Sequence, residues 1–118
     1  MEVAQGDVFW ADLPEPVGSE TGFQRPVVVV QGDDFNASNI ATVVCIPLTS
    51  NLRLARLPGN TLLMTRRTGL PRPSVANASQ IFAPDRSRLG DRIGRVSRAE
   101  LQRIFAGIDA VLGRARQL

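Results

Sequence analysis

The sequence contains no histidine and a single cysteine, and these two scarcities exclude several kinds of catalytic site. Without histidine, the chain cannot form a Ser-His-Asp triad, a Cys-His pair or a zinc site of histidine and cysteine. With one cysteine, it cannot form a disulfide within the chain. Cys45 stands in the apolar run 43–46, so we predict that it is a small core residue rather than a nucleophile.

Lysine is also absent, and so is any apolar run long enough to span a membrane. The 14 basic residues are therefore all arginine, and against 11 acidic residues they give a net charge of +3. The planar guanidinium group of arginine suits the recognition of phosphates and bases. The first residues lack the basic and apolar segments of a signal peptide, so we expect a cytoplasmic protein.

The remaining composition predicts one domain over residues 1–118, because a chain of this length can bury a core without metal or disulfides. We expect a fold that is mostly β, a small barrel followed by a C-terminal helix. Trp10 is expected in the core, and Pro47 at a bulge or an edge. The helix is the clearest element, since Ser97 and Glu100 form a capping box and Gly113 ends it. The expected strands are 7–13, 27–30, 40–48, 61–65, 74–82 and 86–96.

Arg25 immediately precedes Pro26 and the four valines 27–30, which predict a short strand buried on both faces. A residue before proline is held extended, so this guanidinium would stand at the lip of a rigid strand, where it can bind a phosphate. The alternative is a solvated arginine at a strand end. A second polar feature, 49–51, follows the next apolar strand.

Two segments carry arginines between the later strands. The segment 52–57 could grip a nucleic-acid strand, or be a connection whose leucines cover the core. The segment 66–73 is a basic loop too rich in proline and glycine to be regular. Paired aspartates occur only in turn sequences, where this residue is common for backbone reasons, so we expect no catalytic metal and no cofactor.

With these segments placed, the sequence resembles the MazF/PemK family of toxin endoribonucleases over nearly its whole length. The matching segments are 6–13 (GDVFWADL), 18–20 (GSE), 25–29 (RPVVV), 47–50 (PLTS) and 80–81 (QI). The resemblance implies an SH3-like barrel of the kind that CcdB toxins share, a homodimer, and metal-independent cleavage of single-stranded RNA at short sequences. It also implies neutralisation by a MazE-like antitoxin, whose disordered acidic tail lies in the RNA groove.

The same resemblance places the family's catalytic arginine on Arg25 and its catalytic threonine on Thr49. Glu20 matches a loop acid that matters for toxicity, and Ser50 matches a serine of some members. The position before the arginine, often histidine in the family, is Gln24 here, which excludes an imidazole base. Because a guanidinium stays protonated at neutral pH, it is a poor base. We expect Arg25 and Thr49 to hold the transition state. Glu20 is at most an auxiliary base, and the expected product is a 2′,3′-cyclic phosphate.

Sequence choice is expected to come from residues around these two strand ends, because single-stranded bases are read by stacking and by hydrogen bonds to their edges. Phe23 could stack on a base, or instead pin its loop to the core. The arginines could bind RNA or simply be solvated. The predicted RNA-binding residues are Ser19, Phe23, Gln24, Ser50, Asn51, Arg53, Arg56 and Gln80.

Three other functions fit such a barrel. A CcdB-like toxin would poison gyrase by binding, a small RNA-binding barrel would have no activity, and a purely structural dimer module would have neither. The pairing of Arg25 with Thr49 at two strand ends favours the nuclease over the gyrase poison.

Overall fold

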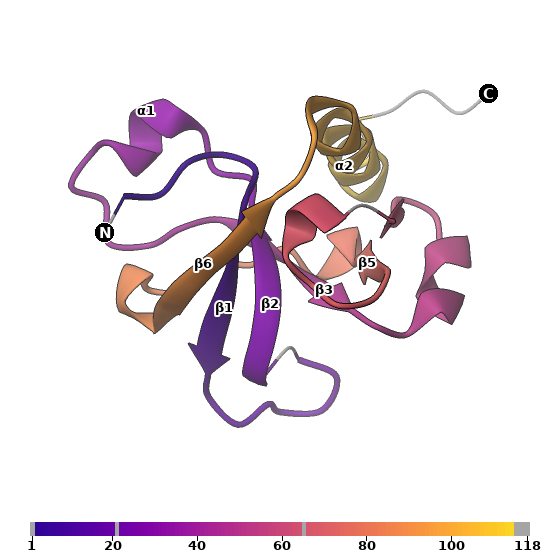
Figure 1. Cartoon of the computed structure of the whole chain (residues 1–118), viewed down its shortest axis with the longest axis horizontal. Helices are drawn as coiled ribbons and strands as arrows, with labels where there is room; N and C mark the ends of the chain where they lie inside the picture. Colours follow the sequence, from indigo (N-terminus) through magenta and orange to yellow (C-terminus); the bar gives the residue numbers. More distant parts are fainter. Residues whose placement is uncertain (1, 21, 65, 115–118) are drawn as a thin grey trace.

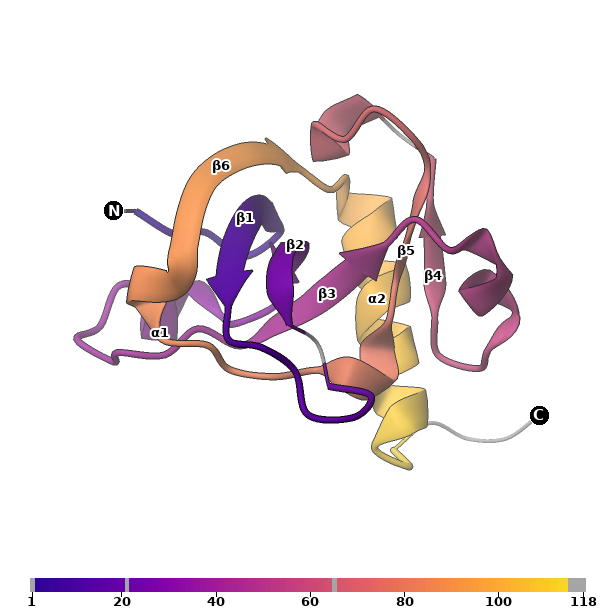
Figure 2. The same ribbon diagram turned by 90° about the horizontal axis from the view of Figure 1, so that it is seen from below.

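The computed structural model describes residues 2–20, 22–64 and 66–114 and contains one curved antiparallel sheet with a C-terminal helix. The strands follow the order β4-β5-β3-β2-β1-β6; Figure 1 labels all of them except β4, which is labelled in Figure 2. Their bounds are β1 (Asp7–Leu13), β2 (Phe23–Val29), β3 (Cys45–Thr49), β4 (Thr61–Leu63), β5 (Ser74–Ala76) and β6 (Leu89–Arg95). The helix α2 (Arg98–Val111) stands beside β3, β4 and β5 (Figure 2). The expectation of a mostly β fold with a C-terminal helix is confirmed.

The valine run lies at the centre of this sheet and is buried on both faces, as predicted. Successive side chains of a strand point to opposite faces. Val28 accordingly packs with Ile46, Leu48 and Ile104 of α2, whereas Val27 and Val29 pack in a second cluster. Each fully buried apolar side chain contributes about 1.5–3 kcal/mol, so the two clusters hold β2 firmly in place.

The strand β2 begins earlier than the sequence suggested. Its first residues pair with β1, with Trp10 opposite Pro26 and Ala11 opposite Arg25. Arg25 therefore lies within a paired strand, in the extended conformation that the following proline favours. This pairing fixes the direction in which the Arg25 side chain leaves the backbone.

Several of the predicted strands were too long. In the segment 40–48 only Cys45–Thr49 is a strand, and it follows a short helix α1 (Asp33–Asn36) and irregular chain. In the segment 74–82 only Ser74–Ala76 is a strand, and a 3₁₀ turn η3 (Ala78–Gln80) follows. The predicted strand 86–96 begins at Leu89, after a turn η4 (Arg86–Arg88). The end of the predicted strand 61–65 lies outside the described residues.

The turn η3 interrupts the pairing between β3 and the segment that follows β5. Leu48 pairs with Ala76, and Cys45 pairs with Phe82, so β3 advances three residues while its partner advances six. Pro47 stands at this interruption, and its carbonyl accepts a hydrogen bond from the N–H of Asn77 at 3.0 Å. An edge position for Pro47 was wrong, because β3 lies inside the sheet. A proline is tolerated there because its missing N–H faces the irregular side.

The capping box of α2 is confirmed. The Ser97 hydroxyl accepts a hydrogen bond from the Glu100 N–H at 3.1 Å, and the Glu100 carboxylate accepts one from the Ser97 N–H at 2.8 Å. Gly113 follows the helix with a φ of 72°. Gly107 lets the helix approach the turn before β4, because a Cβ built there would overlap the Gly59 carbonyl.

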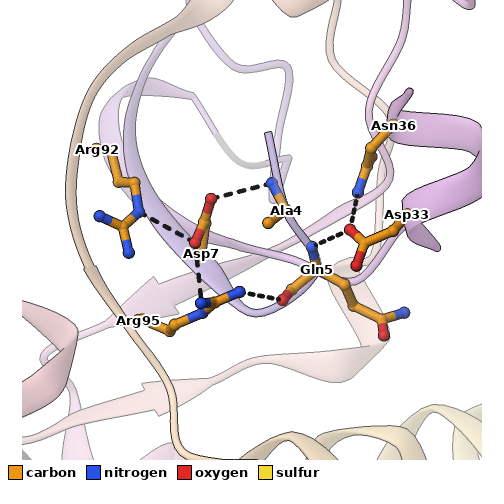
Figure 3. Close-up of polar contacts among 7 residues, drawn as sticks. All are labelled: Ala4, Gln5, Asp7, Asp33, Asn36, Arg92 and Arg95. Atoms are coloured by element: carbon orange, nitrogen blue, oxygen red, sulfur yellow. Dashed lines mark hydrogen bonds and ion pairs between the residues drawn. The ribbon is translucent and has the colours of Figure 1, made fainter. Parts of the chain in front are cut away.

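A buried carboxylate joins β1 to β6 at the end of the sheet away from the loop 14–22. Asp7 is 4 % exposed, and its Oδ1 lies 3.0 Å from Arg92 Nε and 3.6 Å from Arg95 Nε (Figure 3). Its Oδ2 accepts the Ala4 N–H at 3.0 Å. A buried charge is tolerated only when it is paired, so Arg92 and Arg95 have a structural role: they neutralise the buried carboxylate of Asp7.

Candidate active site

The antiparallel register brings the start of β2 and the end of β3 to the same end of the sheet. Val27 pairs with Pro47, and from that pair β2 runs back to Phe23 while β3 runs on to Thr49. The start of β5 joins them, because Thr49 pairs with Val75. The two polar features of the sequence, Arg25 and residues 49–51, therefore meet at one end of the molecule.

A cavity of about 310 Å³ lies at this end and contains Arg25. Its walls come from β1 and β2 on one side, from the end of β3, and from the loop that leads into β5. It brings together the predicted residues Gln24, Arg25 and Ser50 with several that the sequence did not single out. The lining residues are Trp10, Gln24, Arg25, Pro26, Leu48, Ser50, Leu70, Pro71, Arg72, Pro73 and Ser74.

Arg25 is half-buried, and its Nε is fully buried without a hydrogen-bond partner among the described residues. Native proteins satisfy nearly all buried polar groups, because an unpaired buried donor destabilises the fold. A guanidinium N–H held in this way beside a cavity is ready to bind an anionic acceptor such as a phosphate oxygen. Arg25 is therefore only partly solvated, and its binding to a phosphate stays a prediction.

Thr49 is half-buried at the end of β3, and its hydroxyl has one defined partner. Oγ1 accepts the Asn51 N–H at 3.1 Å, while Asn51 Oδ1 accepts the Arg53 N–H at 3.2 Å and caps the 3₁₀ turn η1 (Leu52–Arg56). An accepting hydroxyl keeps its own hydrogen free to donate. Thr49 is not among the residues that line the Arg25 cavity, although Leu48 and Ser50 on either side of it are. The convergence of Thr49 and Arg25 on one phosphate stays a prediction.

Glu20 has a structural role in its loop. Its Oε1 accepts the Val17 N–H at 2.8 Å, and its own N–H donates to the Val17 carbonyl at 3.2 Å. Glu20 lines a different cavity of about 450 Å³, together with Val17, Ser19, Gln80 and Phe82. The role of Glu20 as an auxiliary base therefore stays a prediction.

Gln80 uses its side-chain amide within the protein. Nε2 donates to the Ser19 carbonyl at 2.7 Å, and Oε1 accepts from Asn77 Nδ2 at 3.2 Å. Through these bonds, Gln80 ties the loop before β2 to the turn η3. The contacts show that Gln80 tethers the loop. Base reading by Gln80 and Ser19 stays a prediction.

The other predicted RNA-binding residues are exposed. Phe23 is 61 % exposed and has a φ of 57°, so it does not pin its loop to the core. Leu52 and Leu57 are each 49 % exposed, whereas Leu54 between them is half-buried, so only Leu54 can help to cover the core. Gln24, Asn51, Arg53 and Arg56 are also exposed, and their contact with RNA stays a prediction.

The expectation that Trp10 belongs to the core was wrong. Its side chain is 40 % exposed and forms part of the Arg25 cavity. Phe9 and Ala11 on either side are buried, and the alternation of side chains along β1 puts Trp10 on the opposite face. Sequence reasoning also missed Ser74 and Arg72, although Arg72 stands in the basic loop 66–73 that it had noted.

Cys45 is a core residue, as expected. It is fully buried, and burial raises the pKa of its thiol to about 12. Within the described ranges, no group of three or more histidine, cysteine or acidic side chains lies close enough together to hold a metal ion. No helix of the described chain has both the length and the apolar character needed to cross a membrane.

The fold and this cavity define a small, mostly β protein in which an arginine with an unpartnered Nε lines a cavity at one end of the sheet. The model of the PemK-like, MazF-like toxins of type II toxin–antitoxin systems matches residues 4–112, and the chain belongs to this family.

Two relatives are each 40 % identical to the chain over the residues that align. The endoribonuclease MazF6 of Mycobacterium tuberculosis (strain H37Rv) aligns over 112 residues, 95 % of this chain and 98 % of the relative. The endoribonuclease EndoA of Bacillus subtilis aligns over 93 residues, 79 % of each chain. A solved endoribonuclease in complex with its cognate antitoxin, from a mycobacterial species, superimposes with a TM-score of 0.79. That structure is 23 % identical over 98 % of this chain and 99 % of its own, and supports the fold.

Proposed function

We propose that this chain is the toxin of a type II toxin–antitoxin system and acts as a sequence-specific endoribonuclease on single-stranded RNA. The single observation that carries the proposal is the buried, unpartnered Nε of Arg25 beside an open cavity, at the position of the family's catalytic arginine. Relatives that are 40 % identical and named endoribonucleases support the same activity.

The reaction needs no metal when the RNA supplies its own nucleophile. The 2′-oxygen attacks the adjacent phosphorus, the bond to the 5′-oxygen breaks, and the products are a 2′,3′-cyclic phosphate and a 5′-hydroxyl. Negative charge accumulates on the non-bridging oxygens, and Arg25 stabilises it with hydrogen bonds that strengthen as the charge grows. The Thr49 hydroxyl donates a further bond from the neighbouring strand end.

Two protons must also move. Gln24 replaces the histidine often found beside the arginine, so no imidazole takes the proton of the 2′-hydroxyl. The cationic Arg25 or a water molecule protonates the leaving 5′-oxygen. Glu20 is an auxiliary base at most, because its carboxylate accepts a loop N–H and lines a different cavity. Water therefore receives the 2′-proton in this scheme.

RNA recognition is assigned to the exposed residues that surround the strand ends. Phe23 offers an exposed ring for stacking, and Arg53 and Arg56 offer two exposed cations on η1. Ser19, Gln24, Ser50, Asn51 and Gln80 complete the proposed RNA-binding set.

We also propose a homodimer in the cytoplasm and a MazE-like antitoxin whose acidic tail competes with RNA for the arginine-lined groove. A similar solved endoribonuclease is in complex with its cognate antitoxin. The net charge of +3, carried entirely by arginine, suits both RNA and an acidic peptide.

The decisive test is to incubate the purified protein with a long RNA in EDTA and to map the 5′ ends and terminal groups of the fragments. We expect discrete cuts with 5′-hydroxyl and cyclic-phosphate ends. Arg25→Ala should lower the single-turnover rate by about a hundredfold or more, whereas Arg98→Ala, an exposed arginine at the start of α2, should not. Intact RNA with the wild-type protein would reject the proposal in favour of a binding toxin or a non-catalytic RNA-binding barrel.

A further inference from the structure

Ser74 is the second buried polar group without a partner at the Arg25 cavity. It is the first residue of β5 and is only 4 % exposed. Its Oγ has no hydrogen-bond partner among the described residues. Ser74 Oγ and Arg25 Nε are the two unpartnered side-chain atoms of this kind in the described structure, and both residues line the same cavity.

The sheet register explains why these two groups meet. Thr49, the last residue of β3, pairs with Val75, and Ser74 is the residue before Val75 at the start of β5. Arg25 enters the same end of the sheet from β2. Ser50, which follows β3, and Ser74 both belong to the cavity wall.

The charge of the cavity identifies its ligand. Its charged lining side chains are two arginines, Arg25 and Arg72, and its lining includes no aspartate or glutamate. The indole N–H of Trp10 and the serine hydroxyls add donors. A pocket of donors with positive charge fits an anion that has several acceptor oxygens, which a phosphodiester has.

We infer that Ser74 is an RNA-binding residue, whose hydroxyl donates a hydrogen bond to a non-bridging oxygen of the phosphate that Arg25 holds. The inference rests on the proposed function, because it takes RNA as the source of the phosphate. Ser74 of β5 would then join Arg25 of β2 and Thr49 of β3, so that three strands hold the phosphate.

A purely structural serine and an RNA-binding serine predict opposite results. Removing a buried hydroxyl that has no partner relieves the cost of its burial, so Ser74→Ala should unfold at the same temperature as the wild type or a higher one. If Ser74 binds the phosphate, the same variant should bind RNA more weakly. Ser38 provides the matched control, since its exposed hydroxyl lies in the turn after α1 and is not part of the cavity wall.

The experiment uses an RNA oligonucleotide that contains the mapped cleavage site, with a 2′-deoxy substitution that blocks attack. Fluorescence anisotropy in EDTA measures its affinity for the wild type, Ser74→Ala and Ser38→Ala. We expect Ser74→Ala to bind about tenfold more weakly or worse, the size of one lost hydrogen bond to a charged group. Ser38→Ala should bind like the wild type.

A double variant tests whether Ser74 and Arg25 hold the same phosphate. Arg25→Ala with Ser74→Ala should lose less affinity than the product of the two single losses, because each group helps to position the ligand for the other. If Ser74→Ala does not fold, Ser74→Cys keeps the side-chain size with a weaker donor and should show an intermediate loss.

The outcomes separate the two proposals. Wild-type affinity in a folded Ser74→Ala or Ser74→Cys, together with Arg25-dependent RNA cleavage, would overturn the role of Ser74 and leave the nuclease assignment intact. Absence of RNA cleavage by the wild type, with binding that does not depend on Arg25, would overturn both.

Discussion

The side-chain amide of Gln80 donates a hydrogen bond to the backbone carbonyl of Ser19 at 2.7 Å, across 61 residues of sequence. This bond fastens the loop that leads into β2 to the turn η3. The loop immediately precedes the strand that carries Arg25, so the contact links a loop at the active-site end to the interior of the sheet.

We predict that Gln80→Ala loosens this loop and lowers RNA cleavage. The loss of one such hydrogen bond costs about 1 kcal/mol of stability. Limited proteolysis of the loop and single-turnover cleavage measure the two effects, and Gln102→Ala, an exposed glutamine of α2, is the control. An equal loss at every cleavage site would show that Gln80 only tethers the loop, whereas a changed cleavage motif would show that it also reads a base.

Thr49 should be needed for its hydroxyl rather than for its shape. Thr49→Val keeps the branched side chain but removes the acceptor of the Asn51 N–H and the donor assigned to the phosphate. We expect its single-turnover rate to fall by about a hundredfold. Thr49→Ser, which keeps the hydroxyl, should stay within about tenfold of the wild type, and an active Thr49→Val would remove Thr49 from the mechanism.

The Cys45 thiol should be inert in the folded protein. It is fully buried, and its pKa of about 12 leaves almost no thiolate at pH 8. A thiol-specific aromatic disulfide should therefore label the native protein far more slowly than the protein unfolded in denaturant. Rapid labelling of native protein would mean that β3 opens locally, and Cys45→Ala provides the blank.

Asp33 should give a small stabilisation that depends on pH. Its carboxylate accepts the Gln5 N–H at 2.8 Å and a hydrogen bond from Asn36 at 3.1 Å, and these bonds lower its pKa (Figure 3). A carboxyl group whose pKa is lowered by folding stabilises the protein above its unfolded pKa and loses that contribution as the pH falls through the folded value.

We therefore expect Asp33→Ala to melt below the wild type at pH 7 and to approach it near pH 2.5. The difference should be well under about 1 kcal/mol, because Asp33 is exposed and solvent screens it. Asp34→Ala, a neighbouring exposed aspartate, serves as the control. A difference that grew on acidification would contradict the assignment of these hydrogen bonds.

Gly107→Ala should destabilise the protein even though alanine favours helices. A Cβ at this position would overlap the Gly59 carbonyl oxygen, so α2 would have to move away from the turn before β4. We expect a loss of about 1–3 kcal/mol in thermal unfolding, typical of overpacking. The control Ala106→Gly, at an exposed helix position, should cost about 1 kcal/mol from helix propensity alone.

The sequence was sufficient where a feature depends on neighbouring residues. Four valines between a proline and a glycine specified the buried strand, and Ser97 with Glu100 specified the start of α2. The position of Arg25 followed from Pro26 and from the family motif. These features need no information about distant segments.

The features that failed depend on contacts between distant segments. The predicted strand 74–82 breaks at η3, because β3 pairs with both sides of a three-residue excursion that no local pattern marks. Trp10 was assigned to the core because the sequence does not show which face of β1 carries the loop before β5. The cavity could not be predicted for the same reason, because its walls come from positions as far apart in the sequence as Trp10 and Ser74.

That wide spacing has a consequence during synthesis. A nascent chain that has reached Thr49 already contains the arginine and the threonine, but it lacks the wall formed by 70–74. The complete cavity, which we propose binds the phosphate, therefore arises only late in translation, and this should keep a half-made polypeptide on the ribosome from attacking the message that encodes it.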